Sequence, residues 1–180
     1  IFVIQRSNNE ESHMDIRLHI DKFKHKGFVN MGSSLVGSEE IDKLSRLVKK
    51  QFAATSQSNP DYQDKGGEWA FNLLETVPYA GVVINKIVSN ALIGEFLQEI
   101  LGRDYKVWNV NARRAASGDK GLYLHQDGPG AVDLFVSLDN NLKGDGASIF
   151  LPSSHLIKTS QKKWGVEVPS ILLRFLPFMF

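Results

Sequence analysis

Cysteine is absent from all 180 residues of the chain. Its absence excludes disulfides, thiolate nucleophiles, and zinc or iron–sulfur sites with cysteine ligands, so a bound metal has to use His, Asp or Glu. A chain without cysteine also fits a reducing compartment, and we expect the protein to be cytoplasmic.

Long apolar runs and an excess of one charge are lacking as well. No apolar run approaches the roughly 20 residues that a membrane-spanning helix needs. The chain has 21 Lys and Arg against 20 Asp and Glu, and its basic clusters are short and scattered. We therefore expect neither a membrane nor a nucleic acid as a partner. A hydrophobic share of 42% and this length are typical of one globular domain.

The sequence also lacks the motifs of several large enzyme classes. It contains no Ser-His-Asp nucleophile elbow, no glycine loop that cradles phosphates and no His-Glu-x-x-His helix. Serine hydrolases, P-loop nucleotide hydrolases and that class of zinc protease are therefore not indicated.

Apolar residues recur at helical spacing in the first half of the chain, and capping residues flank these stretches. The predicted helices are Glu10–Lys26, which ends at Gly27; a helix that starts at Gly37-Ser38-Glu39-Glu40 and carries Ile41, Leu44, Val48 and Phe52 on one face; and Asn90–Leu101, which ends at Gly102.

The pattern changes near Gly102 to short alternating segments, each closed by Gly, Pro, Asn or Asp. An earlier polar stretch, Ser56–Gly67, is predicted to be an exposed loop. The predicted strands are Tyr105–Ala116, Gly121–Asp127, Ala131–Leu138 and Ala147–Leu151.

Short strands at this spacing predict an α+β fold with a mainly β core, a jelly roll or double-stranded β-helix of the cupin kind. We expect a single domain over residues 1–180, with a helical flank over 1–102 and the first part of the β core over 103–180.

Three polar side chains share one face of a predicted strand. In Leu122-Tyr-Leu-His-Gln-Asp127, successive side chains point to opposite faces, so Tyr123, His125 and Asp127 lie together. Two His and one carboxylate on one side of an ion leave the open positions that non-haem iron uses for a bidentate co-substrate and dioxygen. A surface strand that carries His and Asp for solubility is the alternative interpretation.

A second segment begins 17 residues after Asp127 and reads Gly144-Asp-Gly-Ala-Ser-Ile-Phe-Leu-Pro-Ser-Ser-His155. Together, the two segments resemble the phytanoyl-CoA dioxygenase family. In that family a His-Gln-Asp strand is followed by a strand and then by an Asn/Asp-Gly-hydrophobic-Val/Leu-Pro-Gly-Ser/Thr-His stretch. The resemblance covers residues 105–158 with motif support.

The resemblance implies an Fe(II)- and 2-oxoglutarate-dependent dioxygenase. Such an enzyme hydroxylates a small-molecule substrate with dioxygen while 2-oxoglutarate becomes succinate and carbon dioxide. It implies that His125 and Asp127 ligate the iron. The family's second His ligand and the Arg that grips the far carboxylate of 2-oxoglutarate come later in the chain, so we expect both beyond Phe180. We also expect both ends of the chain to be cut, because it starts without Met and stops in an apolar run.

Three further residues are candidates for the cofactor or substrate pocket. The resemblance places His155 at a pocket-lining position, with metal binding and a structural turn as alternatives. It places Phe135 where the family often carries a bulky aromatic, although a core residue is also consistent with the pattern. Tyr123 shares the face of the ligands. Because Ser153 stands where the family has Gly, we expect a less strained turn there.

Other interpretations stay open. Asn109, Asn111 and Arg113 share a face of the preceding strand, and Arg113 is either an exposed arginine, which we favour, or a substitute for the carboxylate clamp. One rival function is a non-catalytic jelly-roll module that binds a ligand such as a carbohydrate. A second rival is a metal-dependent, cupin-like isomerase or dioxygenase that ignores 2-oxoglutarate. The sequence carries no signal for the substrate's identity or for an oligomeric state.

Overall fold

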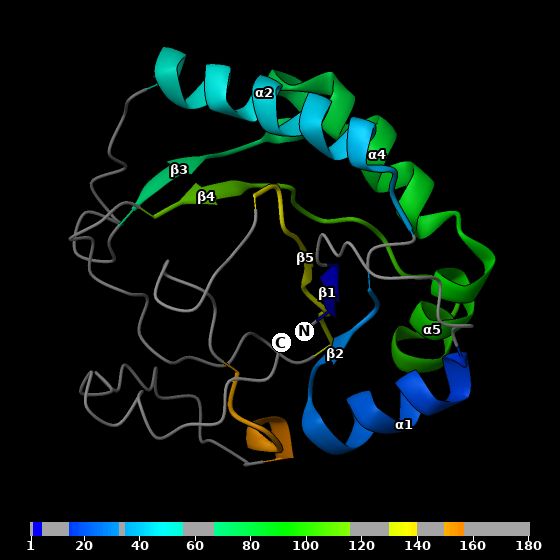
Figure 1. Ribbon diagram of the computed structural model, residues 1–180. Helices are drawn as coiled ribbons and strands as arrows, with labels where there is room; N and C mark the ends of the chain where they lie inside the picture. The colour runs from blue at the N-terminus through cyan, green and yellow to red at the C-terminus, as the bar shows by residue number, and fades with distance from the viewer. Residues whose placement is uncertain are drawn as a thin grey trace.

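The computed structural model in Figure 1 describes residues 2–4, 15–32, 35–55, 67–115, 130–139 and 150–156. The helices are α1 (Ile16–Lys26), α2 (Ser38–Thr55), α3 (Leu73–Thr76), α4 (Pro78–Val88), α5 (Ala91–Leu101) and the short 3-10 helix η2 (Ser154–Leu156). The strands are β1 (Phe2–Ile4), β2 (Val29–Asn30), β3 (Glu68–Ala70), β4 (Ala112–Arg114) and β5 (Leu134–Val136).

Helix α1 is bounded by an aspartate and a glycine. The Asp15 carboxylate accepts hydrogen bonds from the backbone N–H groups two and three residues later, at 3.0 and 3.3 Å. Gly27 follows the last turn with φ +82°, and its N–H donates to the carbonyl of Phe23 at 2.7 Å. The predicted end at Gly27 is confirmed. The predicted start at Glu10 is wrong, because Asp15 has an extended backbone and caps the helix.

Helix α2 buries the apolar face that the sequence predicts. Its residues at helical spacing are at most 5% exposed, namely Ile41, Leu44, Val48 and Phe52. The helix start is held by Gly37, whose carbonyl accepts from the N–H of Ile41 at 3.1 Å and whose N–H donates to Glu40 Oε2 at 2.9 Å. The predicted helix is therefore confirmed in both position and orientation.

Helix α5 confirms the prediction for Asn90–Leu101. The Asn90 carboxamide accepts from the N–H groups of Leu92 and Ile93 at 3.0 and 3.4 Å, and Gly102 follows the helix at φ +87°. Leu92 departs from the predicted apolar face, since it is 36% exposed.

Helix α4 adds to the predicted elements. Pro78 stands at its first position, where a missing N–H costs no helix hydrogen bond. Ala80, Val83 and Ile87 recur at helical spacing and are at most 1% exposed. These two local signals were sufficient to indicate the helix.

Within the described residues, no single helix is long and apolar enough to span a membrane. Only α4 and α5 taken together reach that length and hydropathy, and a bend of 81° separates them. One face of each helix packs in the interior of the protein, where Val83, Ile87, Ile93 and Phe96 are 0% exposed, while Val82 and Leu92 are exposed.

The strands that pair come from distant parts of the chain. Strand β1 lies between β2 and β5 and runs parallel to both, with Val3 opposite Asn30 on one side and Phe135 on the other. Strands β3 and β4 pair antiparallel, with Trp69 opposite Arg113.

The predicted strands are longer than those observed. Of the predicted strand 105–116, which is described as far as residue 115, residues 112–114 form a strand, and of the predicted 131–138 residues 134–136 do. The segment 121–127 lies outside the described residues, and residues 150 and 151, the described end of 147–151, are not in a strand. The jelly-roll core therefore stays a prediction.

The helices flank the two sheets (Figure 1). Helices α2 and α4 lie side by side, with α2 over the β3–β4 pair, while α1 and α5 pack together near β2. One apolar cluster joins the helices, and alternate residues around β5 pack against it, namely Val132, Leu134, Val136 and Leu138. Because side chains alternate along a strand, Phe135 points away from this core.

Ion pairs join elements that are far apart in the sequence. Lys24 Nζ of α1 lies 2.6 Å from Glu99 Oε1 of α5, and Lys86 Nζ of α4 lies 2.5 Å from Glu40 Oε2 of α2. The hydrogen bond from Lys86, with help from the N–H of Gly37, lowers the pKa of Glu40. A carboxyl whose folded pKa is lowered stabilises the fold above its unfolded pKa, and this contribution is lost as pH falls through the folded pKa.

Replacement of Glu40 by Gln removes this titration and keeps the side-chain shape. We expect Glu40→Gln to lower the urea midpoint at pH 7 and to make the midpoint less sensitive to acid between about pH 5 and pH 3, where glutamates titrate. Glu39→Gln, at the preceding exposed position, is the matched control and should keep the wild-type acid response. Equal acid sensitivity of wild type and Glu40→Gln would contradict the role of the Lys86 pair.

Candidate functional site

The structure describes part of the predicted site. His125, Asp127 and Tyr123 lie outside the described residues, whereas Phe135 and His155 lie within them. Among the described residues, no three His, Asp or Glu side chains come close enough together to hold a metal ion. The described part of the site therefore consists of the turn that carries His155, the end of helix α1 and the aromatic residues between them.

The turn that contains Ser153 and His155 donates hydrogen bonds to carbonyl groups at the end of α1. A helix leaves its last four carbonyl groups without a partner inside the helix. The carbonyl of Lys24 lies 3.0 Å from His155 Nε2, and the carbonyl of His25 accepts from Ser153 Oγ at 2.9 Å. The carbonyl of Lys26 accepts from the Ser153 N–H at 2.9 Å. The turn thus satisfies three of the terminal carbonyls, while the carbonyl before them, that of Phe23, accepts from the Gly27 N–H.

The imidazole of His155 is oriented by these contacts. Because a backbone carbonyl can only accept, Nε2 carries the hydrogen in this arrangement. The Nδ1 side of the ring lies against Gly27, where a Cβ atom would come within 2.4 Å of Nδ1 and 2.9 Å of Cγ. His155 itself is exposed to solvent. The structural role at a turn, one of the alternatives for this residue, is therefore the role that the described contacts support.

Ser153 adopts a backbone conformation that glycine favours. Its φ is +62°, in the left-handed region that most side chains avoid. The expectation of a less strained turn is therefore wrong. In this conformation the Ser153 hydroxyl donates to the His25 carbonyl, a bond that offsets part of the strain.

An aromatic row begins beside the same glycine. Phe28 stacks on Phe150 with ring centroids 5.4 Å apart and an interplanar angle of 26°. Phe135 of β5 meets Phe150 edge to face at 5.9 Å and 73°. Phe28 is only 8% exposed, whereas Phe135 is 41% exposed. Phe135 is thus not a core residue but the exposed end of the row.

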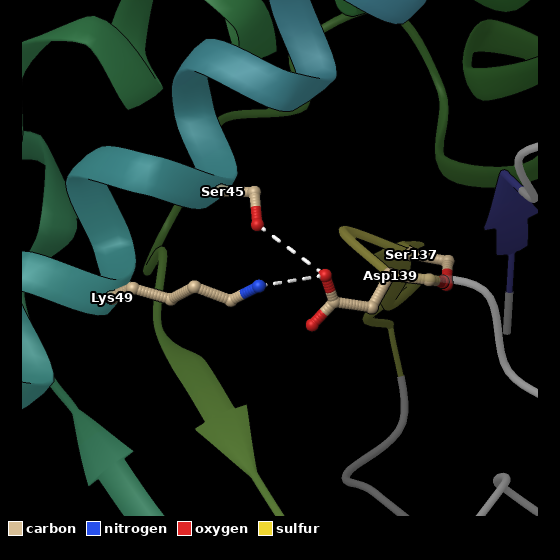
Figure 2. Close-up of polar contacts among 4 residues, drawn as sticks. All are labelled: Ser45, Lys49, Ser137 and Asp139. Atoms are coloured by element: carbon tan, nitrogen blue, oxygen red, sulfur yellow. Dashed lines mark hydrogen bonds and ion pairs between the residues drawn. The ribbon is translucent and has the colours of Figure 1, made fainter.

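The chain after β5 is anchored on α2, as Figure 2 shows. Lys49 Nζ lies 2.9 Å from Asp139 Oδ1, and the buried Ser45 hydroxyl donates to the same oxygen at 3.5 Å. The Ser137 hydroxyl donates to the Asp139 carbonyl at 2.7 Å. The charged side chains are more than half exposed, so the ion pair contributes at most about 1 kcal/mol. Its main effect is to fix the end of the strand that carries Phe135.

Arg113 lies on the face of β4 that points away from α2. Its guanidinium carbon is 6.0 Å from the centroid of the Trp69 ring, and a Cβ at Gly67 would come within 3.3 Å of its Nε. The side chain is half-buried and its Nε is buried. The favoured prediction of an exposed arginine is therefore wrong for this residue. The neighbouring Arg114 is exposed and lies over the ring of Phe52 of α2 at 5.2 Å.

Gly27, Phe28 and Phe150 belong to the described part of the site, and the sequence predicted none of them as a site residue. Gly27 gives the signal of a helix end, and that signal is local. The contacts that give it a second role join residues 131 positions apart, as for Lys24 and His155. A single sequence contains no signal for such a contact.

Two replacements of Ser153 separate its backbone strain from its hydrogen bond. Ser153→Ala keeps the strain and loses the hydroxyl bond, so we expect a loss of about 1 kcal/mol in unfolding free energy. Ser153→Gly loses the bond but removes the strain, so it should be more stable than the alanine variant by roughly 0.5–1 kcal/mol. Urea unfolding measures both changes. An alanine variant as stable as the glycine variant would show that the left-handed conformation is not adopted in solution.

Comparisons with protein-family models, with curated proteins and with solved structures gave no match. The resemblance to the phytanoyl-CoA dioxygenase family is accordingly carried by the residues of the two motifs.

Proposed function

We propose that the protein is an Fe(II)- and 2-oxoglutarate-dependent oxygenase that hydroxylates a small organic substrate. The observation that supports this proposal best is the turn Pro152-Ser153-Ser154-His155. Its backbone is left-handed at Ser153, the position that glycine occupies in the family that the motifs resemble. Ser153 adopts this conformation without being glycine, and its hydroxyl bonds to α1. We take this as support for a structural correspondence with the family's turn rather than a chance similarity of sequence.

His125 and Asp127 are the residues proposed to hold the iron. Imidazole and carboxylate are ligands that suit Fe(II), and their separation by one residue allows both to face one ion from a single strand. The bound iron would supply the redox chemistry with dioxygen and 2-oxoglutarate. The protein's own contribution would be to orient the substrate and to keep water from the reacting atoms.

Phe135 is the described residue best suited to that contribution. It lies outside the core, at the exposed end of the aromatic row that it forms with Phe150 and Phe28. An aromatic ring held by an edge contact presents a rigid apolar surface at low entropic cost. In the proposed site it would form an apolar wall for substrate or co-substrate.

A binding module without catalysis is the second candidate. It is favoured by Trp108, whose side chain is 95% exposed in the segment between α5 and β4, beside Val107 at 45%. An indole ring with a free face and an N–H donor is suited to a ligand that has both apolar and polar groups, such as a carbohydrate.

An anaerobic titration of the full-length protein decides between these functions. Fe(II) is added first and 2-oxoglutarate second, and the visible metal-to-ligand charge-transfer band is recorded. We expect a band that requires both additions and that disappears in His125→Ala and in Asp127→Ala, because each removes an iron ligand.

His155→Ala serves as the matched histidine control in this titration. Its ring faces the end of α1, so the folded variant should still give the band at saturating 2-oxoglutarate. A folded wild-type protein that binds iron without a band on addition of 2-oxoglutarate would indicate the metal-dependent enzyme that ignores this acid. The absence of iron binding would favour the binding module, with Trp108→Ala as the variant to test next.

A further inference from the structure

The end of α1 binds the second motif through two contacts of His155, a hydrogen bond and a close approach to a glycine. His155 Nε2 reaches the Lys24 carbonyl, while the edge of the same ring lies over Gly27. The ring can approach this closely only because residue 27 has no side chain. A Cβ would be 2.4 Å from Nδ1, a distance that real Cβ atoms essentially never show, so the imidazole would have to leave its position against α1.

The next residue connects this contact to the proposed site. Phe28 follows Gly27 and stacks on Phe150, which lies five residues before His155. Phe150 in turn meets Phe135. The segment 150–156 is thus held at two points on the segment 24–28, by carbonyl bonds at one and by ring stacking at the other. A displacement of His155 would shift Phe150 and remove the support of Phe135.

We propose that Gly27 and the carbonyl end of helix α1 position the oxygenase pocket, with His155 as a positioning residue that docks on α1 rather than as a metal ligand. The link to the pocket rests on the proposed function, whereas the docking itself does not. The contact fixes the position of Phe150 and, through it, the position of Phe135, which forms the apolar side of the proposed pocket.

A double-mutant cycle tests the docking without reference to activity. Gly27→Ala is compared with Gly32→Ala, because both glycines have positive φ, +82° and +73°, but a Cβ at Gly32 meets nothing within 4 Å. We expect Gly27→Ala to lower the folding equilibrium constant at least about tenfold more than Gly32→Ala. In the His155→Ala background this extra loss should vanish. An equal loss from Gly27→Ala with and without His155 would overturn the proposal.

If Gly27→Ala fails to fold, the histidine side of the contact provides the test. His155→Gln keeps a donor that can reach the Lys24 carbonyl, so it should be more stable than His155→Ala. Long-range proton–nitrogen spectra of the wild-type imidazoles at about pH 8.5, where histidine is neutral, should show His155 with its hydrogen on Nε2. The signal is assigned by its loss in His155→Gln. A hydrogen on Nδ1 would contradict the docked orientation.

The charge-transfer titration then tests the link to the pocket. At a temperature where all variants are folded, Gly27→Ala should raise the 2-oxoglutarate concentration for half-maximal band about tenfold, since small displacements of positioning groups have effects of this size or larger. Gly32→Ala should stay within about twofold of wild type. If the double-mutant cycle shows coupling between Gly27 and His155 but Gly27→Ala leaves the 2-oxoglutarate titration unchanged, the contact has a structural role alone and the positioning proposal is overturned. If the wild-type protein gives no band but the cycle shows coupling between Gly27 and His155, the proposed function is wrong and the docking contact stands.

Discussion

The position of the second motif on the helices depends on one close approach, that of the His155 imidazole to Gly27. This approach is possible only at glycine, because a Cβ would overlap the ring. It lets a turn from near the end of the chain satisfy three of the last four carbonyls of α1. These carbonyls are accessible to water, so each bond stabilises by about 1 kcal/mol or less. Their larger effect is on geometry, since three bonds and one steric contact define a single docking position.

Stability comes from elsewhere in the molecule. The residues that are 0% exposed, Val83, Ile87, Ile93 and Phe96, belong to α4 and α5, and the apolar cluster around them reaches α1, α2 and β3. Burial of such side chains stabilises by roughly 1.5–3 kcal/mol each relative to exposure. The ion pairs between elements involve side chains that are mostly about half exposed, so their effect is again to orient one element against another. The protein thus combines a helical core that supplies stability with polar contacts that place the β segments on it.

Local signals predicted α2, α5 and the end of α1, and they were present but not used for α4. Non-local contacts account for the shortened strands and for the orientation of the site residues. Helices α2 and α5 follow from apolar spacing and from capping at Gly37, Asn90 and Gly102, all of which are read within a few residues. The strand predicted over 105–116 shrinks to 112–114 because a strand exists only where a partner lies, and β3 ends opposite Ala112. For the candidate site, the family resemblance predicted that His155 and Phe135 line the pocket. Their orientation was not predictable, because it is set by residues 24–28 and by a stack with Phe150.

The docked orientation also bears on which histidine completes the proposed iron site. A metal-bound imidazole commonly donates its other N–H to a backbone carbonyl, as His155 Nε2 does to Lys24, so a metal on His155 would have to bind Nδ1. Nδ1 faces Gly27, and among the described residues no group of His, Asp and Glu that could hold a metal ion includes His155. His19 and His25 each have Nδ1 against a carbonyl one turn earlier, at 2.7 and 3.1 Å. An iron held by His125 and Asp127 therefore requires a third imidazole from outside the described residues, which is where the resemblance to the oxygenase family also puts it.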